Sequence, residues 1–182
     1  MRNSKVKGFT LIELIVVIAI IGVLAAILVP SMLGYVRNAR ISSANANAKQ
    51  IHTAVSSALT QLGISNYFSS TSTDGTVEIS PAEERSGEKV VPAVVSGTSK
   101  DGDLTDKMDL VSYLGENFTG NAIAIFNPAT YSVYAAAWAS NDTVLAEAGS
   151  TRDDLVNKTE QEQKADAKAG SIYGIFPAPK LS

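Results

Sequence analysis

Glu13 is the residue whose setting most strongly suggests chemistry, because this carboxylate lies inside a run of apolar side chains. The run covers the 24 residues from Phe9 to Met32, and no charged residue occurs between Leu14 and Val36. A carboxylate in a membrane core costs roughly 2.5–3.5 kcal/mol on insertion scales, so it usually has a partner or a function. A structural explanation is also open, since Thr10-Leu11-Ile12-Glu13 fits the T-x-x-E capping box at a helix start. The two explanations are compatible.

Four acidic residues and one histidine are the other candidates for a site. Calcium takes six to eight oxygen ligands in one loop, and the spacing of Asp101, Asp103, Asp106 and Asp109 does not match the EF-hand pattern. Asp103 or Thr105 has a simpler role as a helix N-cap.

His52 is the only histidine and the chain has no cysteine, so we expect a surface or packing residue. The sequence shows no phosphate loop, nucleotide fingerprint or paired acid site. It therefore predicts no metal, no cofactor and no enzymatic activity.

Composition narrows the possible partners and linkages. Without cysteine there is no disulfide framework, so the domain must be held by core packing alone. The formal net charge of −3 argues against non-specific nucleic-acid binding, and we predict no specific nucleic-acid partner. Three Asn-x-Thr triplets, at Asn117, Asn141 and Asn157, match the glycan acceptor pattern, which is common by chance.

The N-terminus combines a short basic leader, MRNSKVKG, with an apolar segment of about 20 residues, which is long enough to span a bilayer. The basic leader should stay cytoplasmic, so that the remainder faces outward. An ordinary secretory signal would have a small-residue cleavage site after its apolar region, for which Ala25-Ala26 is a weak candidate. The length of the run, the helical pattern beyond it and Glu13 all oppose that interpretation.

The stretch Lys7-Gly8-Phe9-Thr10-Leu11-Ile12-Glu13 closely resembles the type IV prepilin motif. The resemblance covers roughly residues 5–60 and is most specific at residues 7–13. It implies that a membrane peptidase cuts between Gly8 and Phe9, that the new N-terminal residue Phe9 is methylated, and that Glu13 acts in assembly. It also implies helix-breaking or flexible positions in the anchor, which match Gly22 and Pro30.

This resemblance implies a structural subunit of a type IV pilus, held in the cytoplasmic membrane by one span and then polymerised into an extracellular filament. The implied partners are further copies of the chain (with minor pilins), the prepilin peptidase, the membrane and the pilus assembly platform. Motility, adhesion and DNA uptake are the roles open to such a pilus. The alternative is a pseudopilin of a type II-like secretion or competence system, and the absence of cysteine favours a pseudopilin or a Gram-positive source. A membrane-tethered binding protein or enzyme would need a reactive cluster in residues 63–182, and the sequence shows none.

One helix should extend from Phe9 to about Leu62. Beyond Pro30, small and apolar residues recur at helical spacing; they are Leu33, Ile41, Ala44, Ala48, Ile51, Val55, Ala58 and Leu62. The opposite face carries Arg37, Arg40, Asn45, Lys49 and Ser56. Pro30 removes one backbone hydrogen bond and should kink the helix, with Gly22 as a second weak point.

The remaining sequence predicts a small antiparallel sheet. Residues 65–103 read as a long loop with short strands near 77–79 and 90–95, followed by a helix over 104–115. The best strands are 122–126 and 131–138, joined by a tight turn at Asn127-Pro128-Ala129-Thr130, with Trp138 in the core. Residues 151–169 suggest a surface helix and 172–176 a last strand. We therefore predict an α+β, pilin-like fold in which a long N-terminal helix (membrane anchor plus amphipathic half) packs on this sheet. Its parts are a leader 1–8, an anchor 9–32 and a head 33–182.

Overall fold

The computed structural model describes residues 9–64, 74–80, 84–85, 88–89, 93–99, 102–103, 108–115 and 118–177. The chain divides into two compact units, Met1–Asn38 and Ala39–Ser182, and each is described by itself. The leader 1–8, including Gly8, and residues 104–107 of the expected helix lie outside the described residues.

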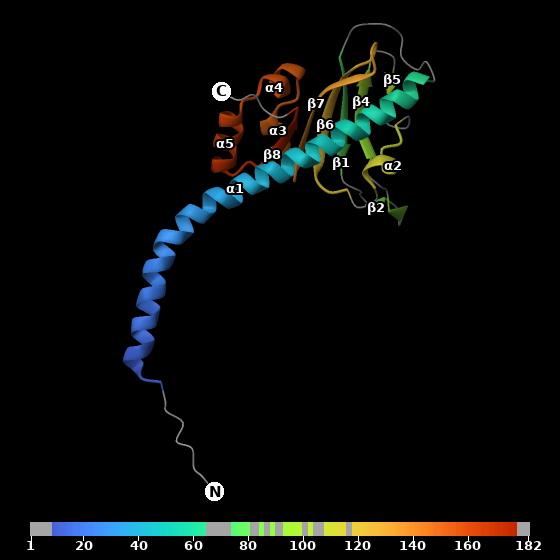
Figure 1. Cartoon of the computed structure of the whole chain (residues 1–182). Helices are drawn as coiled ribbons and strands as arrows, with labels where there is room; N and C mark the ends of the chain where they lie inside the picture. Colours follow the sequence, from blue (N-terminus) through green and yellow to red (C-terminus); the bar gives the residue numbers. More distant parts are fainter. Residues whose placement is uncertain are drawn as a thin grey trace. The chain divides into compact units, whose positions relative to one another are not determined.

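Helix α1 (Leu11–Ile64) is the longest element, with 54 residues, and it starts and ends within two residues of the predicted helix (Figure 1). It is helical through both Gly22 and Pro30. In the second unit its predicted apolar face is buried: Ile51 and Val55 are inaccessible to solvent, and Ala44, Ala48 and Ala58 nearly so. Leu62 packs half-buried against the same core.

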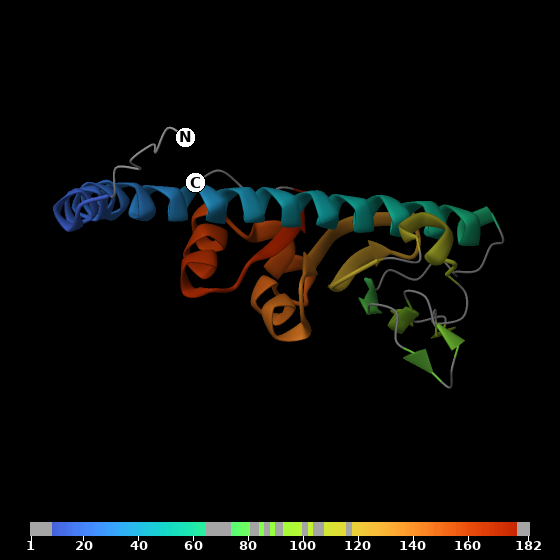
Figure 2. The same ribbon diagram turned by 90° about the horizontal axis from the view of Figure 1, so that it is seen from below.

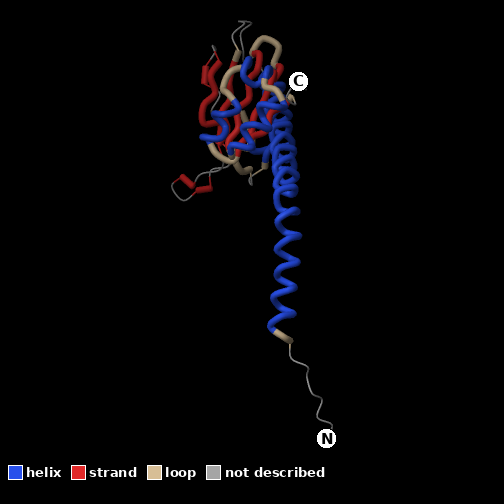
Figure 3. The backbone as a smooth tube through the Cα atoms, turned by 90° about the vertical axis from the view of Figure 1, so that its left-hand side faces the viewer, coloured by secondary structure: helices blue, strands red, loops and turns tan. Residues whose placement is uncertain are grey.

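All strands lie in the second unit, where Figure 3 distinguishes them from the helices. Six of them form one sheet in the order β5-β4-β1-β6-β7-β8, and every neighbouring pair is antiparallel. Their bounds are β1 Gly75–Ser80, β4 Ala93–Ser99, β5 Gly102–Asp103, β6 Asn121–Asn127, β7 Ser132–Ala139 and β8 Tyr173–Phe176. A separate two-stranded sheet pairs β2 (Glu84–Arg85) with β3 (Glu88–Lys89). The predicted α+β fold, with an apolar N-terminal helix on an antiparallel sheet, is confirmed.

The β6–β7 hairpin matches its prediction closely. Asn127 Oδ1 accepts hydrogen bonds from the backbone N–H of Ala129 (2.8 Å) and of Thr130 (3.3 Å), which closes the turn. Tyr131 follows with a φ of 54°, a left-handed conformation at the exit of the turn. Trp138 is half-buried against the core, and its ring N–H donates to the carbonyl of Thr119 at 2.8 Å.

Strand β6 is buried on both faces. Along β6, Ala122, Ala124 and Phe126 join the core formed with α1, whereas Ile123 and Ile125 join a second core on the opposite face. This alternation is the period of two expected of a strand. Figure 2 shows the second half of α1 along one side of the sheet, with helices α3 (Asp142–Ala148) and α4 (Arg152–Asn157) on the other. Ala148 of α3 and Leu155 of α4 are buried in this second core.

Three helical regions differ from the predictions. The expected helix over 104–115 is wrong at Met108–Leu110, which are not helical, and α2 covers only Val111–Leu114. The expected helix over 151–169 is divided into α4 and α5 (Glu160–Ala169). The division occurs because Thr159 begins a capping box of its own, which starts a new helix. Helix α3, which was not predicted, begins at Asn141, whose side chain accepts from the N–H of Val144.

Candidate functional site at the N-terminal segment

Glu13 forms the capping box that its spacing suggests. Its Oε2 accepts hydrogen bonds from the backbone N–H of Thr10 (2.8 Å) and from the Thr10 hydroxyl (2.5 Å). In return, the N–H of Glu13 donates to Thr10 Oγ1 at 3.3 Å. Two N–H groups that a helix start leaves without intrahelical partners are thereby satisfied. Oε2 accepts both of the hydrogen bonds made to the carboxylate. Within the described part of the chain, Oε1 accepts none.

The segment that follows is apolar on all sides. Every large apolar side chain from Leu11 to Val36 is exposed, and so is Phe9, at 79%. Among the described residues, one helix, α1, is long and apolar enough to cross a membrane by length and composition. Its most apolar 18-residue stretch has a mean hydropathy of 3.2, and no residue of that stretch is buried. A side chain placed at Gly22 would meet no atom within 4 Å. A role of Gly22 and Pro30 in helix flexibility stays a prediction.

Polar side chains resume abruptly where the apolar segment ends. Tyr35 is 84% exposed, and Arg37 and Arg40 follow it on α1. Neither arginine has an ion-pair partner among the residues that the structure describes. An aromatic ring and two cations thus border the apolar segment on its C-terminal side, as Thr10 and Glu13 border it on its N-terminal side.

His52 is a packing residue. Its Nε2 lies 3.1 Å from the carbonyl oxygen of Val133, and its ring packs edge-on against Phe176 with the ring centres 4.8 Å apart. Burial lowers the pKa of His52, and the hydrogen bond to the Val133 carbonyl offsets part of that effect. The side chain is held by structural contacts, in agreement with the packing hypothesis.

The acidic cluster does not come together as a site in the described part of the chain. Asp109 accepts hydrogen bonds from the N–H and the hydroxyl of Ser112, at 3.3 and 2.6 Å, which is an ordinary helix-start arrangement. Asp103 lies in β5, while Asp101 and Asp106 lie outside the described residues. Within those residues, no group of three or more histidine, aspartate or glutamate side chains is placed to hold a metal ion.

One further hollow lies at the polar surface of α3 and α4, lined among others by Glu147, Asp153, Asp154 and Glu162. Two of its carboxylates are already engaged, because Asp154 and Glu162 complete the capping boxes of α4 and α5. Of the glycan acceptor triplets, Asn141 caps α3, Asn157 ends α4, and Asn117 lies outside the described residues.

The helical pattern predicts Asn45 on the face of α1 opposite its apolar residues, and this prediction is wrong. Its Oδ1 accepts from Gln163 Nε2 at 2.8 Å and from the backbone N–H of Ile175 at 2.9 Å. Gln163 Nε2 also donates to the carbonyl of Tyr173 at 2.9 Å. The two amide side chains therefore satisfy backbone groups of β8, the last strand of the sheet.

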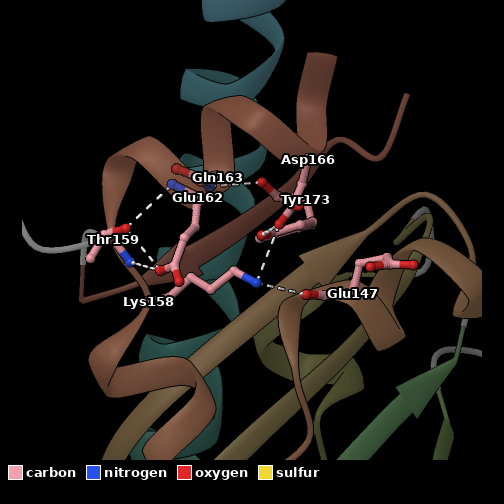
Figure 4. A network of polar contacts seen from close by, with 7 residues as sticks. All are labelled: Glu147, Lys158, Thr159, Glu162, Gln163, Asp166 and Tyr173. Atoms are coloured by element: carbon pink, nitrogen blue, oxygen red, sulfur yellow. Dashed lines mark hydrogen bonds and ion pairs between the residues drawn. The ribbon is translucent and has the colours of Figure 1, made fainter. Parts of the chain in front are cut away.

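A charged extension of this network joins α5 to its neighbours (Figure 4). The hydroxyl of Tyr173 donates to Asp166, and Lys158 Nζ lies 3.2 Å from the same carboxylate oxygen. Lys158 also donates to the carbonyl of Glu147 at 3.0 Å. Burial is the main cause that raises the pKa of Tyr173, and the bond to Asp166 adds to it. We interpret this network as structural, because its polar groups are paired with one another.

Comparison with known proteins assigns the N-terminal segment to a class. Residues 3–29 match the model of the prokaryotic N-terminal methylation motif. The segment is thus type IV pilin-like, and the matched region includes residues 3–8 of the leader, Phe9, Glu13 and most of the apolar run.

Particular relatives agree with this class. The chain is 46% identical over 52 residues to the type IV major pilin protein PilA of Myxococcus xanthus, covering 29% of this chain and 24% of PilA. It is 45% identical over 57 residues to the type IV major fimbrial protein FimA of Dichelobacter nodosus, covering 31% of this chain and 36% of FimA. A fimbrial protein of Moraxella nonliquefaciens is 52% identical over 50 residues, or 28% of this chain and 32% of the relative. The matches thus span only about a quarter to a third of these relatives' lengths. No solved structure matched the chain.

Proposed function

We propose that this chain is a structural subunit of a type IV pilus. The main support is that the methylation motif leads directly into a capped helix, α1, with an exposed apolar surface. The second half of α1 packs into the core of a folded head. In this proposal the prepilin peptidase removes residues 1–8 and Phe9 is methylated. The mature subunit is held in the cytoplasmic membrane until the assembly platform adds it to an extracellular filament made of further copies of the chain.

Glu13 has a specific task in this assembly. Cleavage creates an α-amine at Phe9, which is largely cationic near neutral pH. Thr10 donates both of its hydrogen bonds to Oε2 of Glu13, and among the described residues Oε1 has no donor. In the low-dielectric core of a filament an uncompensated charge is expensive, so pairing of Glu13 with the Phe9 amine of a neighbour would fix the register of addition. The amine of the same chain, four residues away, is the competing partner.

The choice of a pilus over a pseudopilus rests on the relatives, which are named as major pilins and fimbrial proteins. The absence of cysteine keeps a pseudopilin as the second candidate. The two differ in an observable way, since a pilus subunit should be the main protein of long surface filaments seen by electron microscopy. We propose no catalytic activity, because among the described residues Asp154 and Glu162 are engaged in helix caps and Lys158, Asp166 and Tyr173 in the network of Figure 4.

Mass spectrometry of the mature N-terminus tests the processing step. We expect a chain that begins with N-methylated Phe9, and we expect a bulky residue in place of Gly8 to leave the full-length precursor in the membrane. A mature chain that begins near residues 23–27 would identify the segment as an ordinary secretory signal instead.

A pair of substitutions separates the charge of Glu13 from its capping role. Glu13→Gln retains a side chain that can complete a capping box but removes the charge, whereas Thr10→Ala removes the cap partner and keeps the charge. We expect Glu13→Gln to be processed normally and to form at most a tenth of the wild-type filaments. Thr10→Ala should assemble, at a cost of about 1 kcal/mol in helix stability.

Filaments are counted by electron microscopy, and mature subunit in the membrane is measured by immunoblot. Normal filaments from Glu13→Gln together with few from Thr10→Ala would show that capping, and not charge, is what assembly requires.

A further inference from the structure

We propose that the unassembled subunit contacts the bilayer in one defined register, with lipid hydrocarbon around residues 14–34, Glu13 among the inner headgroups, and Tyr35 with Arg37 at the level of the outer headgroups. This inference rests on the proposed function, because it concerns the subunit before it enters a filament. The partner is a phospholipid bilayer. The register differs from an anchor confined to residues 9–32.

Length supports this register. The 23 residues from Leu14 to Val36 contain no charged side chain, and as α-helix residues 14–34 extend about 32 Å at 1.5 Å per residue. The hydrocarbon core of a typical bilayer is about 30 Å thick, and helices cross it with an average tilt of about 20°. A register on residues 9–32 would instead place Glu13 about 6 Å inside the hydrocarbon and leave Leu33 and Val36 in water.

The N-terminal end of α1 favours the headgroup level. The first four N–H groups of a helix have no intrahelical partner, and hydrocarbon offers none. The capping box satisfies the N–H groups of Thr10 and Glu13, whereas those of Leu11 and Ile12 have no acceptor among the described residues. Water and lipid headgroups supply acceptors for them, and they also solvate the Glu13 carboxylate.

The C-terminal end of the segment has the residue types of an outer interface. Tyr35 is 84% exposed, and tyrosine is enriched at membrane interfaces, where its ring lies at headgroup level. Arg37 and Arg40 are three residues apart on α1, so they lie on neighbouring positions of one helix face. Guanidinium groups bind phosphate oxygens in a bidentate manner, which suits them to lipid phosphate.

The cysteine-free chain permits a direct test by single-cysteine labelling. The full chain carrying Leu24→Cys, Leu33→Cys or Asn38→Cys is placed in vesicles of phosphatidylethanolamine and phosphatidylglycerol and exposed to a membrane-impermeant maleimide on the head side. We expect Asn38→Cys to react at least tenfold faster than Leu33→Cys, and Leu33→Cys to be as protected as Leu24→Cys until detergent is added. Equal labelling of Leu33→Cys and Asn38→Cys would overturn the register.

A second variant tests the contribution of the arginines. In a background of Arg37→Leu with Arg40→Leu, the helix should move deeper, so labelling of Asn38→Cys should fall at least fivefold. Unchanged labelling would show that the arginines do not set the register. Labelling of Leu24→Cys without detergent would mean that the segment does not span the bilayer, and this would count against the membrane stage of the proposed function itself.

Discussion

Gly174 lies where β8 passes close to the backbone of α1. A Cβ at this position would lie 1.9 Å from the carbonyl oxygen of Ala44, a backbone atom that no side-chain rotation can move away. We therefore expect Gly174→Ala to destabilise the head by about 3 kcal/mol, the upper part of the usual range for overpacking. The measurement is thermal unfolding of the full chain in detergent, followed by near-ultraviolet circular dichroism.

Gly34→Ala is the matched control, since a Cβ there meets nothing within 4 Å and alanine is the better helix former. Its unfolding temperature should equal or slightly exceed that of the wild type. If Gly174→Ala behaved like Gly34→Ala, the close approach of β8 to α1 would be wrong.

His52 should make stability depend on pH in a narrow window. Its pKa is lowered from 6.5 by burial, so between its folded and unfolded pKa values the unfolded chain binds more protons. The stability contribution is therefore complete above pH about 6.5 and falls as the pH drops through the folded pKa. Asp154 and Glu162, whose pKa values are lowered from 3.8 and 4.5, act only at more acidic pH.

As the only histidine, His52 gives a single imidazole signal in a proton NMR titration. We expect a midpoint below 6.5, and we expect His52→Gln to lose the change in unfolding temperature between pH 7.5 and pH 5.5. A midpoint above 6.5 would contradict the buried environment.

The contrast between Glu13 and Asn45 shows what a sequence can predict about single residues. The partner of Glu13 is Thr10, three residues away, so the spacing alone predicts the capping box. Asn45 reaches Gln163 and Ile175, which lie 118 and 130 residues further along the chain. Only the folded arrangement brings them together, and on the helix pattern alone Asn45 is indistinguishable from a solvent-exposed residue.

At the scale of elements, β8 ends the sheet and its outer edge is satisfied by side chains from α1 and α5. Asn45→Ala leaves the N–H of Ile175 without its acceptor and removes a partner of Gln163. An unsatisfied buried group costs about 1–3 kcal/mol, and we expect a loss of stability in that range. Faster amide exchange at Ile175, measured by NMR or mass spectrometry, should accompany it.

Gln50→Ala, on the exposed side of the same helix, is the control and should be within about 0.5 kcal/mol of the wild type. Equal stability and equal exchange at Ile175 in the two variants would refute the role of Asn45 at the sheet edge.

Elements with a strong local pattern were predictable, and the others depended on tertiary context. Helix α1 and the β6–β7 hairpin follow from apolar spacing and from the Asn127-Pro128 turn. Strand β1 was expected as a minor strand of a loop, yet it lies between β4 and β6 inside the sheet. Its short polar-flanked sequence carries no information about its neighbours, because those pairings are made over long distances in the chain.

For the whole molecule, we predict that residues 33–182 form a soluble, folded monomer without the anchor. The second unit holds its own cores, in which Ile51, Val55 and Leu59 of α1 are completely buried. A fragment of residues 65–182 should fail to fold, because it lacks this side of the core. Circular dichroism and size-exclusion chromatography distinguish the two fragments, and an unfolded 33–182 fragment would disprove the independence of the head.

The way in which α1 is held inside the head has a mechanical consequence. A tensile load that reaches the first residues of the head enters it along the backbone of α1. Inside the head, packing and hydrogen bonds hold α1 in place along several turns. The packing is made by the buried side chains of Ile51, Val55 and Leu59, and the hydrogen bonds by Asn45. Pulling along the helix must therefore shear many contacts at once, whereas peeling a terminal strand breaks them one after another. A head built in this way is suited to resist force applied along α1.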